Sequence, residues 1–521
     1  STLSLNGDLN LSGSAFTAPT TLVLNTNPTT LTGAGTISVT TLTLNDLALT
    51  LASTNLTVTN AVTIDNANEQ IITAGNNLTL TAAPVMSLGQ LTSSGGTVTM
   101  PAATTITSGT FDMSSTTLVL TGAGTFDLNT AVVTSPAILT LGGITTLANE
   151  DLSITTLNLT DFALTLNTAN LTVANLVAFD NAAEQIITAG NNLTLTAGFA
   201  MTDGDITSTA GNITLGGSTT GALGTLDFTG STLTLNGSLD TSSIGGNFTA
   251  PNDLAITANA VLTLANPLSV TSLTLNDLAL TMAGDLTVTN TIALDATTEQ
   301  IITAGNNLTL NNTLTLSDGA ITSTGGTVVL NTANITGGTI DITGTTITQS
   351  NNVSLVLSTV TSNSATVWNI GAGFTLTLTG TSGSIDGTIN IPAAAILTAA
   401  ATGTADIDAP FINPKRRRPE GGYGIDHKKN ARKLLLHHQP DFCDGIAGTG
   451  SGLDVNHTEH LGIRMTLQHR PDLVRCCCLS RRNLYLLRAA THRTNQIRQH
   501  LTEYAGAHGH AKVLRFEDRI H

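Results

Sequence analysis

The chain has 521 residues, of which 40% are hydrophobic, 10% charged and 3% aromatic. This composition excludes a disordered polar tract and is unlike that of an ordinary enzyme. Every Lys and Arg lies at or after Lys415, so residues 1–414 carry 25 acidic residues and a net charge of -25, whereas the remainder carries 19 basic and 10 acidic residues, or +9. Because residues 1–414 cannot neutralise phosphates, we expect no nucleic-acid partner for residues 1–412 and no attraction to anionic membranes.

The sequence also lacks several features that would target or stabilise a chain. It contains no run of 18 apolar residues that could span a bilayer, and its first residues lack the basic and apolar regions of a signal peptide. Residues 1–414 have no Cys, which excludes a disulfide scaffold and a thiolate metal site there. We therefore expect packing and hydrogen bonds to stabilise this part.

A duplicated module organises the chain up to residue 412. Residues 1–40 are a partial copy, modules follow near 42–156, 157–271 and 272–330, and residues 331–412 are a further degraded copy. The string EQIITAGNNLTL begins at Glu69, Glu184 and Glu299, which are 115 residues apart. A fixed period of this kind is typical of repeat architectures, in which each unit packs on its neighbours.

Within each module, apolar and polar residues alternate, as in Asn77-Leu78-Thr79-Leu80-Thr81. Period two indicates strands, and the Gly-Asn, Gly-Gly and Asn-Asp pairs between them indicate turns. Strands with one apolar face cannot stand alone, so we predict an all-β parallel β-helix, or β-solenoid. At about 20 residues a coil and about 4.8 Å between strands, residues 1–412 would form a rod on the order of 100 Å. A β-propeller is the main alternative, but its blades need a shorter period, of roughly 40–50 residues.

Phrases such as Asn192-Leu193-Thr194-Leu195-Thr196-Ala197 and Gly305-Asn306-Asn307-Leu308-Thr309-Leu310 resemble the repeats of secreted bacterial β-helix proteins. These include filamentous haemagglutinin-like adhesins and autotransporter passengers. The resemblance covers most of residues 1–412 and implies an extracellular or bacterial cell-surface location. It also implies an adhesive or structural role.

Carboxylate pairs repeat with the module, at Asp65 and Glu69, Asp180 and Glu184, and Asp295 and Glu299. Paired carboxylates are what a glycosidase needs, and oxygen ligands suit Ca²⁺. The simpler interpretation is that they lie in the turn before the EQIIT strand and accept backbone hydrogen bonds. Three equivalent copies argue against one active site, so we nominate no catalytic, cofactor-binding or metal-binding residue and expect no cofactor.

Three further acids, Asp112, Asp227 and Asp341, recur near the module spacing and are expected on outward strand or turn positions. A carbohydrate-degrading β-helix of the tailspike or lyase type is the enzymatic alternative. Lyase chemistry usually requires Lys, Arg or His beside a carboxylate, and residues 1–414 contain none. We therefore expect no enzyme here.

The alternating pattern stops after Asn413-Pro414, and residues 413–521 contain all the His and Cys. Cys443, His457, His460 and Cys476-Cys477-Cys478 suggest zinc, but their spacing matches no zinc motif. We predict a basic tail of irregular or helical structure. It is either a foreign reading frame or a genuine basic segment, and as a genuine segment it could cap the rod, bind an acidic partner or bind nucleic acid.

These expectations favour a stiff extracellular stalk. Its partners would be a host or neighbouring cell surface, matrix or glycan, or further copies of the chain. Carbohydrate binding is the main alternative role.

Overall fold

The computed structural model describes residues 1–12, 16–26, 29–33, 35–244, 247–380, 383–392, 394–401, 404–408, 411–412 and 434–437. The chain divides into two units, and the second, residues 440–459 and 463–521, lies outside the described residues. Within the first unit the described residues form a parallel β-solenoid of about 19 turns. The predicted fold class is thus confirmed, and a propeller is excluded.

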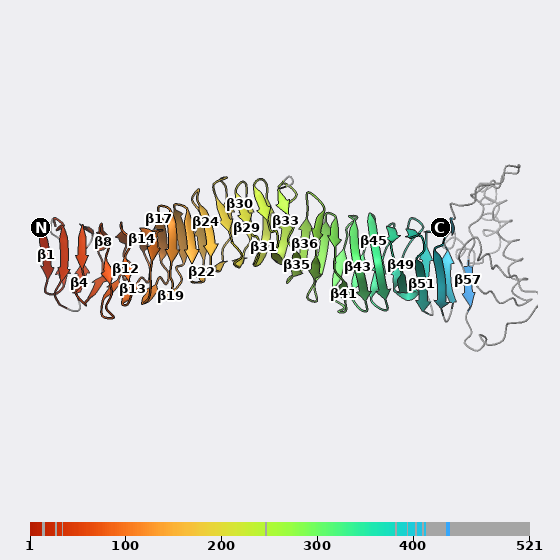
Figure 1. Cartoon of the computed structure of the whole chain (residues 1–521), viewed down its shortest axis with the longest axis horizontal. Helices are drawn as coiled ribbons and strands as arrows, with labels where there is room; N and C mark the ends of the chain where they lie inside the picture. Colours follow the sequence, from red (N-terminus) through yellow and green to blue (C-terminus); the bar gives the residue numbers. More distant parts are fainter. Residues whose placement is uncertain are drawn as a thin grey trace, which may run out of the picture. The chain divides into compact units, whose positions relative to one another are not determined.

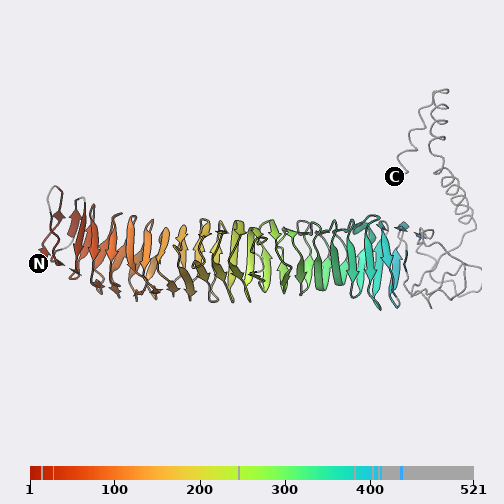
Figure 2. The same cartoon turned by 90° about the horizontal axis from the view of Figure 1, so that it is seen from above.

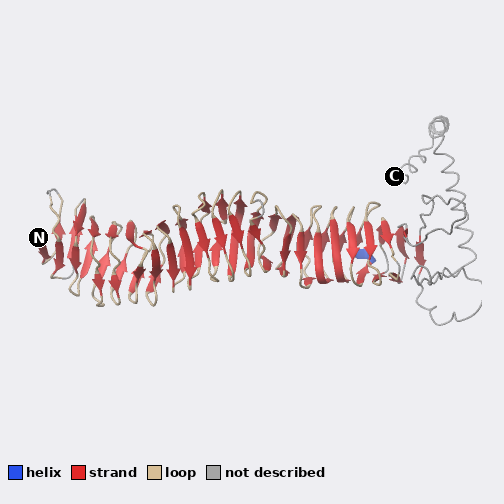
Figure 3. Ribbon diagram, turned by 45° about the horizontal axis from the view of Figure 1, so that its top comes forward, coloured by secondary structure: helices blue, strands red, loops and turns tan. Residues whose placement is uncertain are grey.

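Short strands follow one another along the solenoid and are joined by tight loops (Figures 1 and 2). Figure 3 shows loops between nearly every pair of strands. The single helical segment among the described residues is the 3₁₀ turn η1 (Leu357–Thr359). Accordingly, no described helix is long or apolar enough to cross a membrane.

Each turn contributes one strand to each of three parallel stacks, which we call faces 1, 2 and 3. Face 1 contains β1 (Thr2–Leu5), β3 (Thr21–Leu24), β6 (Thr41–Thr43), β9 (Thr63–Ile64), β12 (Val85–Met86), β15 (Thr104–Thr105), β18 (Gly124–Asp127), β21 (Thr145–Ala148), β24 (Ala163–Asn167), β27 (Gln185–Ile187), β30 (Asp205–Thr207), β32 (Thr225–Asp227), β34 (Phe248–Thr249), β37 (Leu268–Val270), β40 (Leu286–Val288), the first parts of β43 (Leu308–Leu316) and β45 (Thr327–Ile335), β47 (Thr346–Gln349), β50 (Val367–Ile370), β53 (Thr388–Asn390) and β56 (Phe411–Ile412).

Face 2 follows face 1 in every turn. It contains β2 (Leu9–Asn10), β4 (Thr29–Thr32), β7 (Ala48–Leu51), β10 (Gln70–Ile72), β13 (Gln90–Thr92), β16 (Thr110–Asp112), β19 (Val132–Thr134), β22 (Leu152–Ile154), β25 (Leu171–Val173), β28 (Leu193–Leu195), the first parts of β31 (Asn212–Gly221) and β33 (Thr232–Asp240), β35 (Asp253–Ile256), β38 (Ser272–Thr274), β41 (Ile292–Leu294), the second parts of β43 and β45, β48 (Val353–Val356), β51 (Thr375–Gly380) and β54 (Ile396–Ala401).

Face 3 closes each turn. It contains β5 (Thr36–Val39), β8 (Asn55–Val58), β11 (Leu78–Leu80), β14 (Thr97–Pro101), β17 (Thr117–Thr121), β20 (Ile138–Gly142), β23 (Thr156–Asn158), β26 (Val177–Phe179), β29 (Phe199–Met201), the second parts of β31 and β33, β36 (Ala260–Thr263), β39 (Ala279–Ala283), β42 (Gln300–Ile302), β44 (Ala320–Thr322), β46 (Thr339–Asp341), β49 (Val360–Thr361), β52 (Ser384–Asp386) and β55 (Thr404–Asp408).

The alternating sequence fills a dry interior. In β28, Leu193 and Leu195 are buried and the Thr194 side chain between them points outward. In-register pairing then stacks like on like, as in Leu171 with Leu193 and Leu193 with Ile213. Such stacking buries an apolar column and pairs the backbone groups of neighbouring turns.

The three modules do not lie one above another. The repeated Gln-Ile-Ile strand is β10 on face 2 in the first copy, β27 on face 1 in the second and β42 on face 3 in the third. The reason is that β27 is the seventeenth strand after β10, and three strands make one turn. Each module therefore spans five and two-thirds turns, close to the predicted six, and each successive copy is rotated by one third of a turn.

The same count holds between the second and third copies. Only 15 labels separate β27 from β42, but β31 and β33 each continue around a corner and pair on two faces. Counting each of them twice restores 17 strand positions.

Of the predicted basic tail, the structure describes only β57 (Leu434–His437), which pairs antiparallel with β55. The rest of residues 413–521, including Cys443, His457, His460 and Cys476-Cys477-Cys478, lies outside the described residues.

Candidate functional site

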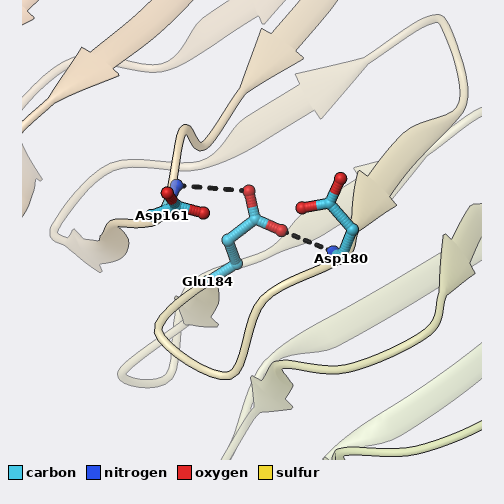
Figure 4. Close-up of side chains that lie close together, drawn as sticks. All are labelled: Asp161, Asp180 and Glu184. Carbon is cyan, nitrogen blue, oxygen red and sulfur yellow. Dashed lines mark hydrogen bonds between the residues drawn. The ribbon is translucent and has the colours of Figure 1, made fainter.

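The second copy brings three acids together at a corner of the solenoid. Carboxylate oxygens of Asp161, Asp180 and Glu184 all lie within 4.8 Å of one another, and Glu184 is buried while the two aspartates are exposed. Figure 4 shows Glu184 between the other two. The sequence shows Asp180 and Glu184 as one of the repeated carboxylate pairs. Asp161 belongs to the preceding turn, and the sequence analysis did not single it out.

Backbone N–H groups hold the Glu184 carboxylate in place. The backbone N–H of Asp180 donates to Oε2 at 2.6 Å, and that of Asp161 donates to Oε1 at 3.3 Å. The glutamate thus fastens the turn before its own strand to the loop of the preceding turn. This arrangement confirms the predicted turn position.

The first copy repeats both bonds, because the backbone N–H groups of Asp65 and Asp46 donate to Glu69 at 2.7 and 3.3 Å. In the third copy the backbone N–H of Asp295 donates to Glu299 at 2.7 Å. All three glutamates are at most 7% exposed. Because buried carboxylates are costly without hydrogen-bond donors, this recurrence indicates a structural role that all three modules need.

The loop under each glutamate contains two consecutive residues in the left-handed region. They are Asn45 and Asp46 in the first copy, Thr160 and Asp161 in the second, and Asn276 and Asp277 in the third. The Asn45 amide donates to the Leu24 carbonyl at 2.8 Å, and the Thr160 hydroxyl donates to the Leu141 carbonyl at 2.6 Å. Asn tolerates this conformation better than β-branched Thr, so the second copy keeps the hydrogen bond at a conformational cost.

The chemistry available at this corner is narrow. Both oxygens of Glu184 already accept hydrogen bonds, and residues 1–414 contain no Lys, Arg or His to act as a proton donor or anion stabiliser. Since the modules are rotated, the three corners lie on different sides of the solenoid. They cannot combine into one active site.

A buried hydroxyl chain, which the sequence analysis missed, begins directly after the strand that follows each corner. Thr188 donates to Ser208 at 2.8 Å, and Ser231 donates to the same Ser208 oxygen at 2.7 Å. Thr73 with Ser93, and Thr303 with Ser323, repeat the first bond. All these side chains are buried. The signal was present, because alternation from buried Glu184 through Ile186 makes Thr188 an inward position.

The acids Asp112, Asp227 and Asp341 each end a strand and are half-buried. Each accepts a hydrogen bond from the backbone N–H two residues later, at 3.0, 3.1 and 3.0 Å. They form the side-chain turns typical of Asp, which confirms their predicted strand or turn position.

A shallow groove lies over face 1 in the third copy. Its lining residues are Pro267, Asp285, Leu286, Thr287, Asn307, Thr309, Thr327 and Val329. Asp285 accepts hydrogen bonds from the backbone and side-chain nitrogens of Asn307, at 2.8 and 2.9 Å. No residue of this lining is basic or aromatic, so the polar groups that the groove offers are hydroxyl, amide and carboxylate groups.

Comparison with known proteins adds no relative. The sequence matches no protein-family model, and neither curated proteins nor solved structures give a significant match.

Proposed function

We propose that this protein is an extracellular stalk of a bacterial surface or secreted protein, with a mechanical and adhesive role. The observation that carries the proposal is the stack of about 19 turns, in which parallel strands of successive turns pair on all three faces. A column of this kind holds its surface at a fixed distance from its base. At about 4.8 Å a turn, 19 turns extend about 90 Å.

The absence of basic residues from residues 1–414 supports a non-enzymatic role. Polysaccharide lyases and hydrolases need a proton donor or an anion stabiliser near the reacting bond. The glutamates at the repeated corners accept hydrogen bonds from backbone N–H groups. The proposal therefore assigns these glutamates to structure.

Adhesion is tested with beads coated with the full chain, applied to cultured cells, extracellular matrix and a glycan array. Trypsin supplies a matched control, because every Lys and Arg lies at or after Lys415 and cleavage there leaves the solenoid sequence intact. We expect adhesion to survive trypsin. No adhesion to any surface, or adhesion lost with the tail, would overturn the proposed role of the solenoid.

An enzyme is tested by incubating the chain with a panel of polysaccharides and measuring new reducing ends and unsaturated products. We expect no turnover. Turnover that disappears with Asp180→Asn or Glu184→Gln, while the variants remain folded, would replace the stalk with a carbohydrate-degrading β-helix.

Carbohydrate binding is the second candidate function, and the groove over face 1 favours it. Hydroxyl, amide and carboxylate groups are suitable hydrogen-bond partners for a neutral sugar. Thr287→Tyr would fill the groove, and Thr172→Tyr, at the equivalent position of the second copy, is the control. Glycan binding that is lost only with Thr287→Tyr would support this function, and equal binding by both variants would contradict it.

A further inference from the structure

One seven-stranded sheet of the solenoid contains no charged residue, although residues 1–414 carry a net charge of -25. It is the seven-stranded sheet of face 3 from β5 to β23. Its outward positions form two ranks that run along the solenoid. One rank is Ser38, Thr57, Thr79, Thr99, Val119, Thr140 and Asn158, and the other is Thr36, Asn55, Asn77, Thr97, Thr117, Ile138 and Thr156.

Five of the seven side chains in the first rank, which we call the array, carry a hydroxyl group, and the other two are Val119 and Asn158. Thr57, Thr79 and Thr99 occupy successive turns in direct register. They are half-exposed, and their hydroxyls make no hydrogen bond to another described residue. A threonine hydroxyl has one donor and two acceptor sites, so water must satisfy these groups. Because χ1 of β-branched residues is restricted, the hydroxyls and methyls hold that water in a repeating pattern.

The array recurs once per module and moves with the one-third rotation. In the second copy it is Ser153, Thr172, Thr194, Thr214, Thr234, Ala255 and Thr274 on face 2. In the third copy it is Ser269, Thr287, Thr309, Val329, Thr348, Asn369 and Asn390 on face 1. Each side of the solenoid thus presents one such rank, with Asp253 in the neighbouring rank of the second copy and Asp285 beside the rank of the third.

The dimensions of the array restrict its partner. Seven strands at about 4.8 Å extend about 29 Å, and two outward positions along a strand are about 6.6 Å apart. A strip about 29 Å long and about 13 Å wide covers about 400 Å², half of the roughly 800 Å² per partner of a stable protein interface. A second protein copy is therefore a poor occupant. A rigid neutral lattice that engages every rung needs no such area, because each further contact forms without a new association cost.

We propose that these threonine ranks bind ice. Their hydroxyls would take the places of water molecules in the crystal surface, and their methyl groups would lie against the lattice between them. The direct parallel register and the regular spacing of the hydroxyl groups fit a crystal of water, and the first array also lies on a sheet without charged residues. The three arrays would let the solenoid adsorb to ice through any of its three sides.

The full chain is tested by nanolitre osmometry for thermal hysteresis and by inhibition of ice recrystallisation. The blocking variant is Thr79→Tyr/Thr194→Tyr/Thr309→Tyr, which places one bulky residue in each array. The control is Thr92→Tyr, since Thr92 is also half-exposed but pairs with Ile72 and Asp112 in a mixed rank. Circular dichroism and thermal melting establish that both variants fold.

We expect the wild-type chain and the control to show thermal hysteresis, and the triple variant to lose it by about tenfold, because adsorption depends on many rungs engaging together. Absence of both ice activities in the wild-type chain would overturn the proposal. So would a folded triple variant with full activity. Self-association in analytical ultracentrifugation that the triple variant alone abolishes would assign the face to a second copy instead.

Discussion

Thr188 and Thr194 lie in the same turn of the second module and have opposite environments. Thr188 is fully buried and its hydroxyl donates to Ser208 at 2.8 Å, whereas Thr194 points outward and its hydroxyl has no partner among the described residues. The interior corner uses polar groups to fix one turn to the next. The exterior rank leaves the same chemistry to solvent. Residue type alone therefore does not identify a surface, and the inward or outward register does.

The largest effect on the free energy of unfolding is expected at the buried carboxylate of Glu184. Glu184→Ala removes the acceptor of the Asp161 and Asp180 backbone N–H groups and should destabilise the chain by about 3 kcal/mol, the upper value for hydrogen bonds to a charged group. Glu184→Gln keeps the shape but only one accepting oxygen, so it should cost less. Urea unfolding measures both.

Glu150→Ala is the matched control for this comparison, because Glu150 is half-buried and no other described residue is hydrogen-bonded to its carboxylate. Its free energy of unfolding should change little. Equal destabilisation by Glu184→Ala and Glu150→Ala would show that the corner contributes nothing beyond general loss of a side chain.

The hydroxyl chain should give the next largest effect. Ser208→Ala leaves Thr188 without its acceptor and also removes the oxygen that accepts from Ser231. A buried polar group without a partner costs about 1–3 kcal/mol, so we expect a loss of about 2 kcal/mol. Hydrogen exchange should locate the loss in the turns that contain β27 and β30. Unchanged exchange in these strands would contradict a role of the chain in joining turns.

A gain in stability is expected where the second copy departs from the other two. Thr160 has φ 53°, and the equivalent residues Asn45 and Asn276 have φ 51°. Thr160→Asn should stabilise the chain by about 1 kcal/mol, since an ordinary L-residue in the left-handed region costs roughly 1–2 kcal/mol and Asn less. Asn45→Thr should destabilise by a similar amount. Thermal unfolding of the two variants should therefore shift in opposite directions, and shifts in the same direction would refute the explanation.

The sequence predicted the architecture because its two strongest signals are physical ones. Alternation in segments such as residues 77–81 requires strands with one apolar face, and the 115-residue period requires stacking. The turn position of Glu184 also followed from its place before a strand. The acid of the neighbouring turn, Asp161, was not predicted, because pairing between turns depends on the length of each coil.

The rotation of the modules escaped the sequence for the same reason. Neighbouring paired residues are separated by 22 positions between Leu171 and Leu193 but by 20 between Leu193 and Ile213. Loops of unequal length make the coil period irregular, so a 115-residue repeat does not reveal how many strands it contains. Thr188 was overlooked because a polar residue in an alternating pattern was assumed to point outward.

The smallest effect is expected on the outer rank. Thr194→Ala removes an outward hydroxyl without an observed protein partner, and such surface substitutions usually change stability by no more than about 0.5 kcal/mol. Thr188→Ala, six residues earlier, is the interior counterpart and should cost several times more, because it breaks the bond to Ser208. Urea unfolding of the two variants compares the same chemical change on the two sides of one wall. An equal loss of unfolding free energy in the two variants would mean that the inward register does not determine the role of these threonines. The distinction between the buried hydroxyl chain and the solvent-facing rank would then fail.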